Sequence, residues 1–377
     1  MIAPTKIRIL ECIRQGQIGG GESHLLSLVE NLDRTRFEPV VLSFTDGPMI
    51  DRLQQMGVTT HVIYTTKPFN VLKWSTVKRF IEKENIQLIH AHGTRAFSNV
   101  IWAARTLKLP VIYTIHGWSF HDDQKWWVKK LRVAGEAYLV QRSDINISVS
   151  KSNQLTGKKM IPSFDSVVIN NGINLKKFNA SGSYADVREE LNIPKDAIVL
   201  LFVARLTRQK QPLALIEAFE KALASNPKLH LLMVGDGEDK PKAIQLIKKL
   251  RLEDKTTMLK ARSDVPALLA ASDIFVLPSL WEGLPIGLLE AMSMGKAIIA
   301  SNADGTIEII EDGINGLLVQ INDLVNTTAS AITKLSNDGP LRKKLGEEAK
   351  ITITQRFNAE VMTNRIEELY TQLMEAT

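Results

Sequence analysis

Short apolar segments alternate with longer amphipathic segments along almost the whole chain, and this alternation strongly constrains the fold. The apolar segments have the length and composition of buried strands, and the amphipathic segments have helical spacing. Strands that alternate with helices are typical of a parallel sheet, because a crossover helix returns the chain to the same edge. The sequence therefore predicts an α/β protein.

The alternation is interrupted once, by the polar stretch 174–194, which is rich in Asn, Ser, Gly and Pro. A chain of 377 residues is long enough for two domains. We predict an N-terminal domain at 1–176, a linker region at 177–194 and a C-terminal domain at 195–356. A last helix within 357–377 could pack back on the N-terminal domain.

Strands are expected on both sides of this interruption. In the first half they fall at 7–12, 38–44, 60–63, 88–91, 111–115, 145–148 and 167–169. In the second half they fall at 198–203, 229–234, 256–259, 274–277, 297–300 and 316–319. Helices are expected between them, and the last three are at 323–335, 340–356 and 359–375.

Composition and charge exclude several classes of protein. The single Cys12 excludes a disulfide framework. The longest apolar run, 198–204, is far shorter than the roughly 18–20 residues that span a bilayer. The first apolar stretch is broken by Arg8 and Glu11, so we expect no secretory signal and a cytoplasmic protein. The net charge of +6 is interpreted as a mild excess of surface lysine, and no motif indicates nucleic-acid binding.

A glycine-rich turn follows the first strand, with Gly19, Gly20 and Gly21 just before a predicted helix. Glycines let the backbone approach a ligand closely, and a helix N-terminus attracts anions. The spacing differs from the dinucleotide fingerprint. A tight strand-to-helix turn without a ligand explains the glycines equally well.

Arg205 and Lys210 follow the first strand of the second half. Ligands of open parallel sheets bind at the carboxyl ends of the strands, so both cations are candidates for holding phosphate. The alternative is solvated surface charge, which is our interpretation of Arg208.

Two glutamates follow the predicted strand 274–277. Glu282 lies in the loop before Pro285, and Glu290 lies within the helix that we expect from Pro285 on. Apolar neighbours surround Glu290, so its carboxylate needs partners such as ribose hydroxyls. The alternative is a helix cap followed by one surface glutamate.

Through these residues the sequence resembles the family 4 glycosyltransferases, which have the GT-B fold and retain anomeric configuration. The resemblance covers nearly the whole chain, and its most specific element is the pair Glu282 and Glu290. The family often has glycine before the arginine and after the lysine, where this chain has Ala204 and Gln211. The supporting motifs are Gly19–Gly21, His116-Gly117, Ser148 with Ser150, Asn170–Ile173, Arg205 with Lys210, and Val234–Gly237.

The resemblance implies two Rossmann-like domains facing each other across a cleft, and a role for each matching residue. Arg205 and Lys210 would hold the donor pyrophosphate and stabilise the leaving group. Glu290 would bind the ribose, and Glu282 would contact the transferred sugar. His116 would lie against that sugar as a base or as a structural residue. The other donor-binding candidates are Gly19, Gly20, Gly235, Arg262, Val265, Gly283, Leu284 and Ile286.

The nucleotide sugar is a substrate, with a UDP-sugar favoured over a GDP-sugar, and we expect no cofactor and no metal. His121, Asp122 and Asp123 lack a matching ligand set and are interpreted as the start of a helix over 124–141. Basic aromatic segments at 67–80 and 125–132 fit either core helices or contact with the inner face of a membrane. The acceptor would then be lipid-linked, as in surface polysaccharide assembly.

Two other functions remain open at the level of the sequence. A sugar-nucleotide epimerase on the same fold would bind the same donor without an acceptor. A non-enzymatic sugar-nucleotide-binding protein would bind it without reaction.

Overall fold

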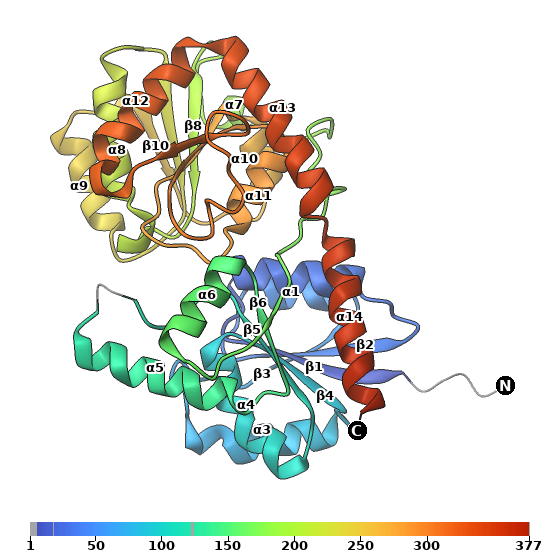
Figure 1. Cartoon of the computed structure of the whole chain (residues 1–377). Helices are drawn as coiled ribbons and strands as arrows, with labels where there is room; N and C mark the ends of the chain where they lie inside the picture. The colour runs from blue at the N-terminus through green and yellow to red at the C-terminus, as the bar shows by residue number, and fades with distance from the viewer. Residues whose placement is uncertain (1–5, 18, 122–123, 377) are drawn as a thin grey trace. The chain divides into compact units, whose positions relative to one another are not determined.

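The computed structural model describes residues 6–17, 19–121 and 124–376 (Figure 1). They form two compact units. Unit 1 comprises the described residues up to Gly172 together with those from Ala359 on, and unit 2 comprises Ile173–Asn358.

Unit 1 is built on a parallel sheet of seven strands in the order β3-β2-β1-β4-β5-β6-β7. The strands are β1 (Ile7–Ile13), β2 (Phe37–Ser43), β3 (Thr59–Val62), β4 (Leu88–His92), β5 (Val111–Ile115), β6 (Ile145–Ser148) and β7 (Val167–Val168). Its helices are α1 (Gly20–Asn31), α2 (Pro48–Gln55), α3 (Val71–Lys83), α4 (Thr94–Leu107), α5 (Trp126–Val140), α6 (Lys151–Met160) and α14 (Ala359–Glu375).

The side chains of the interior strand β1 alternate between two buried faces of this sheet. Leu10 and Cys12 join the core that includes residues of α3 and α4. Ile9 packs with residues of α1 and α14 on the opposite face. Helices therefore cover both faces, as an all-parallel sheet requires.

The C-terminal helix α14 belongs to unit 1 although it follows unit 2 in the chain. Met362, Ile366 and Tyr370, at helical spacing, are buried in the same core as Ile9 and Leu28. The last segment of the sequence thus completes the apolar core on this face of the sheet of unit 1.

Unit 2 is built on a parallel sheet of six strands in the order β10-β9-β8-β11-β12-β13. The strands are β8 (Ile198–Val203), β9 (Leu229–Val234), β10 (Thr256–Leu259), β11 (Ile274–Leu277), β12 (Ala297–Ser301) and β13 (Leu317–Val319). Its α-helices are α7 (Val187–Glu190), α8 (Pro212–Leu223), α9 (Lys240–Lys249), α10 (Val265–Ala270), α11 (Ile286–Ser293), α12 (Leu324–Asn337) and α13 (Gly339–Arg356).

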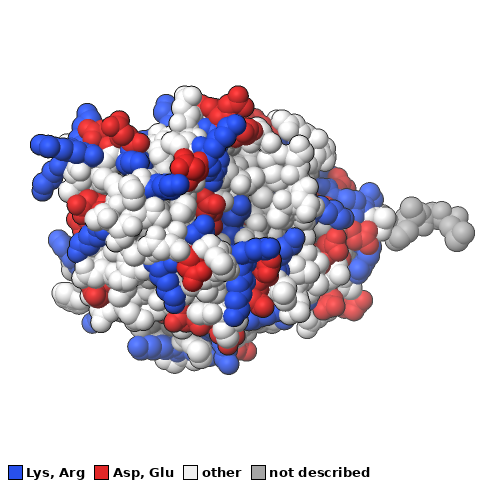
Figure 2. Space-filling model, turned by 90° about the horizontal axis from the view of Figure 1, so that it is seen from above, with Lys and Arg blue, Asp and Glu red and all other residues white. Residues whose placement is uncertain are grey.

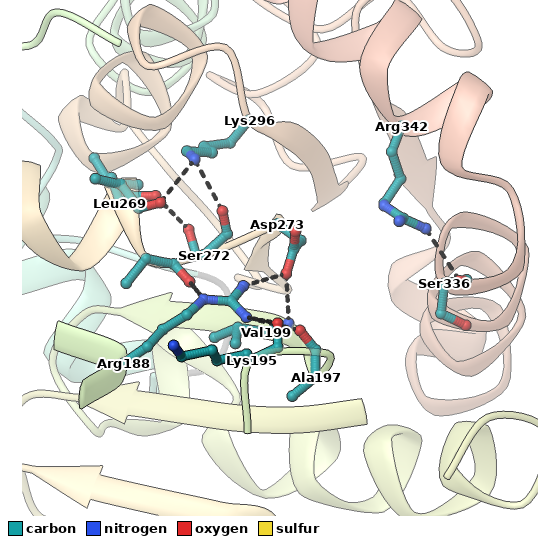
Figure 3. Close-up of polar contacts among 12 residues, drawn as sticks. Arg188, Lys195, Ala197, Val199, Leu269, Ser272, Asp273, Lys296, Ser336 and Arg342 are labelled. Atoms are coloured by element: carbon teal, nitrogen blue, oxygen red, sulfur yellow. Dashed lines mark hydrogen bonds and ion pairs between the residues drawn. The ribbon is translucent and has the colours of Figure 1, made fainter. Parts of the chain in front are cut away.

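The predicted linker region, 177–194, lies within unit 2. Arg188 of α7 holds it there, because its guanidinium donates to the carbonyls of Ala197 and Ala271 and to the carboxylate of Asp273 (Figure 3). The same Asp273 oxygen accepts the backbone N–H of Val199 in β8. Few apolar residues mark this segment in the sequence, and its contacts with the rest of unit 2 are scattered along it, so its attachment is hard to predict.

Each sheet has its first strand near the middle, and the chain proceeds outward from it in both directions. The direction reverses between β1 and β4 in unit 1 and between β8 and β11 in unit 2. Loops that leave the carboxyl ends of such neighbours diverge and open a crevice, which is where ligands of open α/β sheets bind. These two places locate the candidate sites.

On the face of the molecule in Figure 2, basic and acidic side chains are interspersed. That face therefore carries charges of both signs rather than one uniformly basic patch. Among the helices of the described residues, none has both the length and the apolar character to cross a membrane.

Candidate active site

In unit 2, the loops after β8 and β11 are joined across the point where the strand order reverses. Lys210 forms an ion pair with Glu282, and their side chains are only 15% and 7% exposed. Gln209 reinforces the junction: its side chain donates to the carbonyl of Trp281 at 2.8 Å, and its own carbonyl accepts the N–H of Leu280. The structure thus brings together a cation and a carboxylate that are far apart in the sequence.

Arg205, at the end of β8, has an exposed side chain. Arg208 in the following turn is also exposed. Gln211 adopts a left-handed conformation, with φ of 54°, immediately before α8. Glycine adopts that conformation without strain, which gives a physical reason for the glycine that the family often has where this chain has Gln211.

Gly235 follows β9, and packing accounts for its lack of a side chain. A Cβ atom there would lie 2.0 Å from the carbonyl oxygen of Ala204, and φ is 149°. A Cβ on Gly237 would lie 2.2 Å from the carbonyl oxygen of Leu206. The loops after β8 and β9 are therefore packed backbone to backbone, and both glycines are needed for that contact.

Glu290 lies on α11 among the buried side chains of Leu288, Leu289 and Ala291, and is itself partly exposed. Burial raises the pKa of Glu290 to about 7, against the opposing effect of the positive charge of Lys177. Pro285 is the N-cap of α11, whereas the sequence predicted it in the first turn of that helix. Glu290 is therefore a carboxyl group whose protonation changes near neutral pH.

The loop before α11 is fixed by Gly305, a residue that the sequence did not single out. Its backbone N–H donates to the carbonyl of Glu282 at 3.2 Å. A Cβ on Gly305 would lie 1.9 Å from the carbonyl oxygen of Gly283. The backbone of Glu282 and Gly283 is thus held in place. Leu284 and Ile286, which flank Pro285, are buried.

Arg262 follows β10, at the edge of the sheet, and Val265 begins α10. The guanidinium of Arg262 bonds to the carboxylates of both Asp264 and Glu190. These partners raise the pKa of Arg262 and link α7 to this loop. The side chain of Arg262 is thus already engaged in structural contacts.

In unit 1, the glycine-rich turn lies against His116. Gly19 is the N-cap of α1, and a Cβ on Gly20 would have no heavy atom within 4 Å. A Cβ on Gly21 would approach the His116 Cδ2 atom to 3.3 Å. Gly20 therefore leaves open space at the helix N-terminus, while Gly21 allows His116 to pack closely.

A buried polar cluster behind His116 was not predicted from the sequence. His116 Nε2 lies 3.1 Å from His92 Nδ1, and His92 Nε2 lies 2.8 Å from Glu11 Oε2. Tyr370 of α14 donates to the other Glu11 oxygen at 2.7 Å, and His90 Nδ1 lies 2.6 Å from the Tyr370 hydroxyl. Two features of the sequence could have indicated the cluster. Glu11 lies within an apolar strand, and His90 and His92 lie two residues apart, so they point to the same face of β4.

His24 of α1 completes the cluster, with its Nδ1 atom 2.9 Å from Asn171 Oδ1. Donor atoms of His24, His92 and His116 lie within 4.8 Å of one another, and so do those of Glu11, His90 and His92. Either group is close enough to share an ion, a possibility that the search for metal ligands in the sequence overlooked.

Burial sets the protonation of this cluster. It lowers the pKa of His24 to about 3 and that of His92 to about 4, with further lowering by neighbouring histidines. It also lowers the pKa of His116 well below the usual range. For Glu11, burial opposes ionisation, but His90 and His92 outweigh it and hold the pKa below its usual range. The cluster therefore contains an anionic carboxylate and, at neutral pH, neutral rings at His24, His92 and His116.

Two family models match consecutive parts of the chain. Residues 18–177 match the model described as Glycosyltransferase Family 4, and residues 183–352 match the model described as Glycosyl transferases group 1. The chain belongs to glycosyltransferase family 4.

Relatives and solved structures agree with this assignment. The glycosyltransferase is 27% identical, over 98% of both chains, to the UDP-Gal:alpha-D-GlcNAc-diphosphoundecaprenol alpha-1,3-galactosyltransferase of Escherichia coli. It is 28% identical, over 90% of its length and 93% of the relative's, to the N,N'-diacetylbacillosaminyl-diphospho-undecaprenol alpha-1,3-N-acetylgalactosaminyltransferase of Campylobacter jejuni. HepE of Anabaena, solved with UDP and glucose, has a TM-score of 0.85 at 23% identity, with 97% of this chain and all of that chain covered. The predicted GT-B fold is confirmed.

The basic aromatic segments of the glycosyltransferase form the helices α3 and α5 and the loops before them. On α5, Trp126, Trp127 and Leu131 are 70%, 54% and 69% exposed, so they are not core residues. On α3, by contrast, Trp74 is half-buried and stacks on Trp102 of α4. Asp122 and Asp123, predicted to start the helix over 124–141 that the structure shows as α5, lie outside the described residues.

Proposed function

We propose that this glycosyltransferase moves a hexose from a nucleoside diphosphate sugar to a lipid-linked or glycan acceptor, with retention of configuration and without a metal. The observation that carries the proposal is the ion pair between Lys210 and Glu282 at the reversal point of unit 2. A UDP-sugar is the preferred donor. The name of the Escherichia coli relative, with UDP-Gal as donor and a diphosphoundecaprenol-linked acceptor, supports both choices.

The ion pair is suited to exchange partners when the donor arrives. Its side chains are largely removed from water, so each charge interacts strongly with whatever lies nearest. A pyrophosphate near Lys210 would compete with Glu282 for the ammonium group. Glu282 would then be released to accept hydrogen bonds from the hydroxyls of the sugar.

Negative charge grows on the leaving nucleoside diphosphate as the sugar–phosphate bond breaks. Lys210 and Arg205 are fixed cations beside the strand end, so they would stabilise that charge where it develops. They would supply the stabilisation that a divalent metal gives elsewhere. No covalent nucleophile is assigned, and a donor phosphate oxygen would receive the acceptor proton on the same face.

The remaining residues are assigned to parts of the donor. In unit 2, Glu290 binds the ribose, the backbone of Gly283, Leu284 and Ile286 faces sugar or phosphate, and Gly235 shapes the loop. The base lies near Arg262 and Val265, where the engaged guanidinium of Arg262 favours contact through the backbone. In unit 1, Gly19 and Gly20 approach the phosphates, and His116 contacts the sugar.

The experiment that tests this proposal is a panel of nucleotide sugars with and without polyprenyl diphosphate-linked sugar acceptors. We expect UDP to be released only when an acceptor is present. Formation of an isomeric sugar nucleotide without acceptor would indicate an epimerase, and binding without reaction would indicate a sensor. The same assay in excess chelator tests the role of metal, and activity lost there and restored by magnesium would contradict metal independence.

We also propose that α5 places the enzyme on an anionic membrane surface, where a lipid-linked acceptor resides. Trp126, Trp127 and Leu131 are exposed beside the basic side chains Lys130 and Arg132. Such helices lie in the interface through apolar and electrostatic contact together. Replacing Leu131 by Ser should reduce sedimentation with phosphatidylglycerol vesicles. The matched change at Leu155 of α6, which is 56% exposed, should not.

A further inference from the structure

A continuous chain of hydrogen bonds runs from Glu11 to His116 in unit 1. Glu11 Oε2 accepts from His92 Nε2, and His92 Nδ1 faces His116 Nε2. These atoms come from the neighbouring strands β1 and β4 and from the residue after β5, on one face of the sheet. The other nitrogen of His116, Nδ1, is buried and has no hydrogen-bond partner in the described structure.

The far end of the chain is an anchored carboxylate. Tyr370 donates its hydroxyl hydrogen to Glu11 Oε1, and His90 Nδ1 lies 3.3 Å from Glu11 Oε2. The Tyr370 hydroxyl gives its hydrogen to Glu11 and so can only accept from His90 Nδ1, 2.6 Å away, which places a hydrogen on that nitrogen. Every group facing the Glu11 oxygens is therefore a donor, so this carboxylate acts only as an acceptor.

Hydrogen-bond polarity then passes along the chain. A carboxylate accepts from His92 Nε2, so that atom carries the hydrogen. A neutral imidazole has one hydrogen, which leaves His92 Nδ1 as an acceptor. An acceptor 3.1 Å from His116 Nε2 requires a hydrogen on that nitrogen. His116 Nδ1 is consequently left with its lone pair.

We propose that Glu11 and His92 are positioning residues that hold His116 with its hydrogen on Nε2, so that Nδ1 accepts a hydrogen bond from a hydroxyl of the transferred sugar. This inference rests on the proposed function for the identity of the ligand. The opposite polarity would place the lone pair of His92 Nε2 against the Glu11 carboxylate, 2.8 Å away. His116 packs the Cδ2 edge of its ring against Gly21, which leaves the Nδ1 edge on the other side of the ring.

The unpaired Nδ1 atom also has an energetic meaning. A buried acceptor without a partner destabilises a protein, so such atoms are rare unless a ligand satisfies them. A sugar hydroxyl would satisfy this one. A nucleoside diphosphate alone lacks the transferred sugar and would leave the Nδ1 atom without a partner.

The direct test is nitrogen NMR of the protein labelled at histidine, with His116 assigned by its loss in His116→Gln. We expect the signals of a neutral ring with a hydrogen on Nε2 and a bare Nδ1, and a shift of the Nδ1 signal when donor sugar binds. His230 in unit 2 serves as the reference ring. A hydrogen on Nδ1 of His116 in the unmodified protein would overturn the inference.

The kinetic test uses His92→Phe, which removes the acceptor for His116 Nε2 and keeps a ring of similar size. We expect kcat/KM for the donor to fall by about 2- to 12-fold, the value of one neutral hydrogen bond, with UDP affinity unchanged. With the unmodified enzyme, one mono-deoxy donor should show a kcat/KM lower by the same factor than that of the full donor. With His92→Phe, that mono-deoxy donor and the full donor should have the same kcat/KM. Equal losses of UDP and donor affinity would indicate a merely structural role.

Two further results keep this inference separate from the proposed function. If no sugar is transferred but His116 carries its hydrogen on Nε2, the proposed function fails and the polarity of the chain stands. If transfer occurs and metal analysis finds one ion per chain lost in His24→Ala, then His116 Nε2 is a ligand and the inference fails. The wild-type NMR measurement decides the matter even if His92→Phe does not fold.

Discussion

Glu282 and Glu290 occupy neighbouring positions in the sequence but opposite electrostatic environments. Glu282 is paired with Lys210, so removal of the lysine would leave a largely buried carboxylate without its cation. Glu290 has a pKa raised to about 7 by burial, so at neutral pH it is divided between its neutral and charged forms. One residue is suited to exchange partners, and the other is suited to respond to pH.

We predict that nucleoside diphosphate affinity rises with pH through about 7. Only ionised Glu290 can accept from both ribose hydroxyls, and its fraction grows as pH passes the raised pKa. Calorimetric titration with UDP at pH 6 and pH 8 measures the change. Glu290→Gln should bind more weakly and keep only the pH dependence of the phosphate itself. An unchanged slope in that variant would remove Glu290 from the ribose site.

We predict that Arg205→Ala and Lys210→Ala each lower turnover by about 10²–10³, because the charge that they stabilise is largest in the transition state. Arg208→Ala, an equally exposed cation in the same turn, is the control and should be near normal. Lys210→Ala should differ from Arg205→Ala in stability. It should also lower the melting temperature, because Glu282 loses its partner. Steady-state assays and thermal melts separate the two effects.

At the scale of elements, the glycines of the two strand-end loops serve different purposes. Gly235 is compressed against the backbone of Ala204, so it fixes one loop on another. Gly20 is the first residue of α1, and the space that a side chain would occupy there is empty. The structure thus distinguishes a glycine required for packing from one that leaves room for a ligand.

We predict that Gly235→Ala destabilises the protein by more than about 3 kcal/mol, since its Cβ would overlap a carbonyl oxygen and its φ disfavours a side chain. Gly20→Ala should fold normally but bind the donor more weakly. Denaturant unfolding and donor titration of both variants test the contrast. A stable Gly235→Ala protein would show that the two loops can separate freely.

At the scale of the whole molecule, the two units differ in their buried titratable groups. Unit 1 contains Glu11 with the histidine cluster, while Glu290 is the carboxyl group with a strongly raised pKa in unit 2. The pKa values of His24 and His92 are about 3 and 4, below the ordinary value of 6.5. At a pH between these values and 6.5, the folded unit 1 therefore binds fewer protons than the unfolded chain. Stability from these rings is present above pH 6.5 and is lost as pH falls toward 4.

We predict that unit 1 loses stability before unit 2 on acidification from pH 7.5 to 5. Each of the two rings contributes about 1 kcal/mol of loss per pH unit below 6.5. Glu290 acts in the opposite direction, because a raised pKa makes its ionisation unfavourable as pH rises. Hydrogen exchange of β1 and β4, compared with β8 and β9, measures the two units separately. Equal protection at both pH values would refute the prediction.

The sequence by itself determined the two parallel α/β sheets, because strand length and helical periodicity are local properties that tertiary contacts do not reverse here. It also located Lys210 and Glu282 in the loops that follow two parallel strands, since such loops share one edge of the sheet. Only the tertiary structure decided that 177–194 belongs to unit 2, because scattered contacts such as Arg188 with Asp273 and Glu190 with Arg262 hold it there. The cluster behind His116 likewise depends on three strands and the last helix meeting at one place, and no local pattern records which buried polar groups will become neighbours.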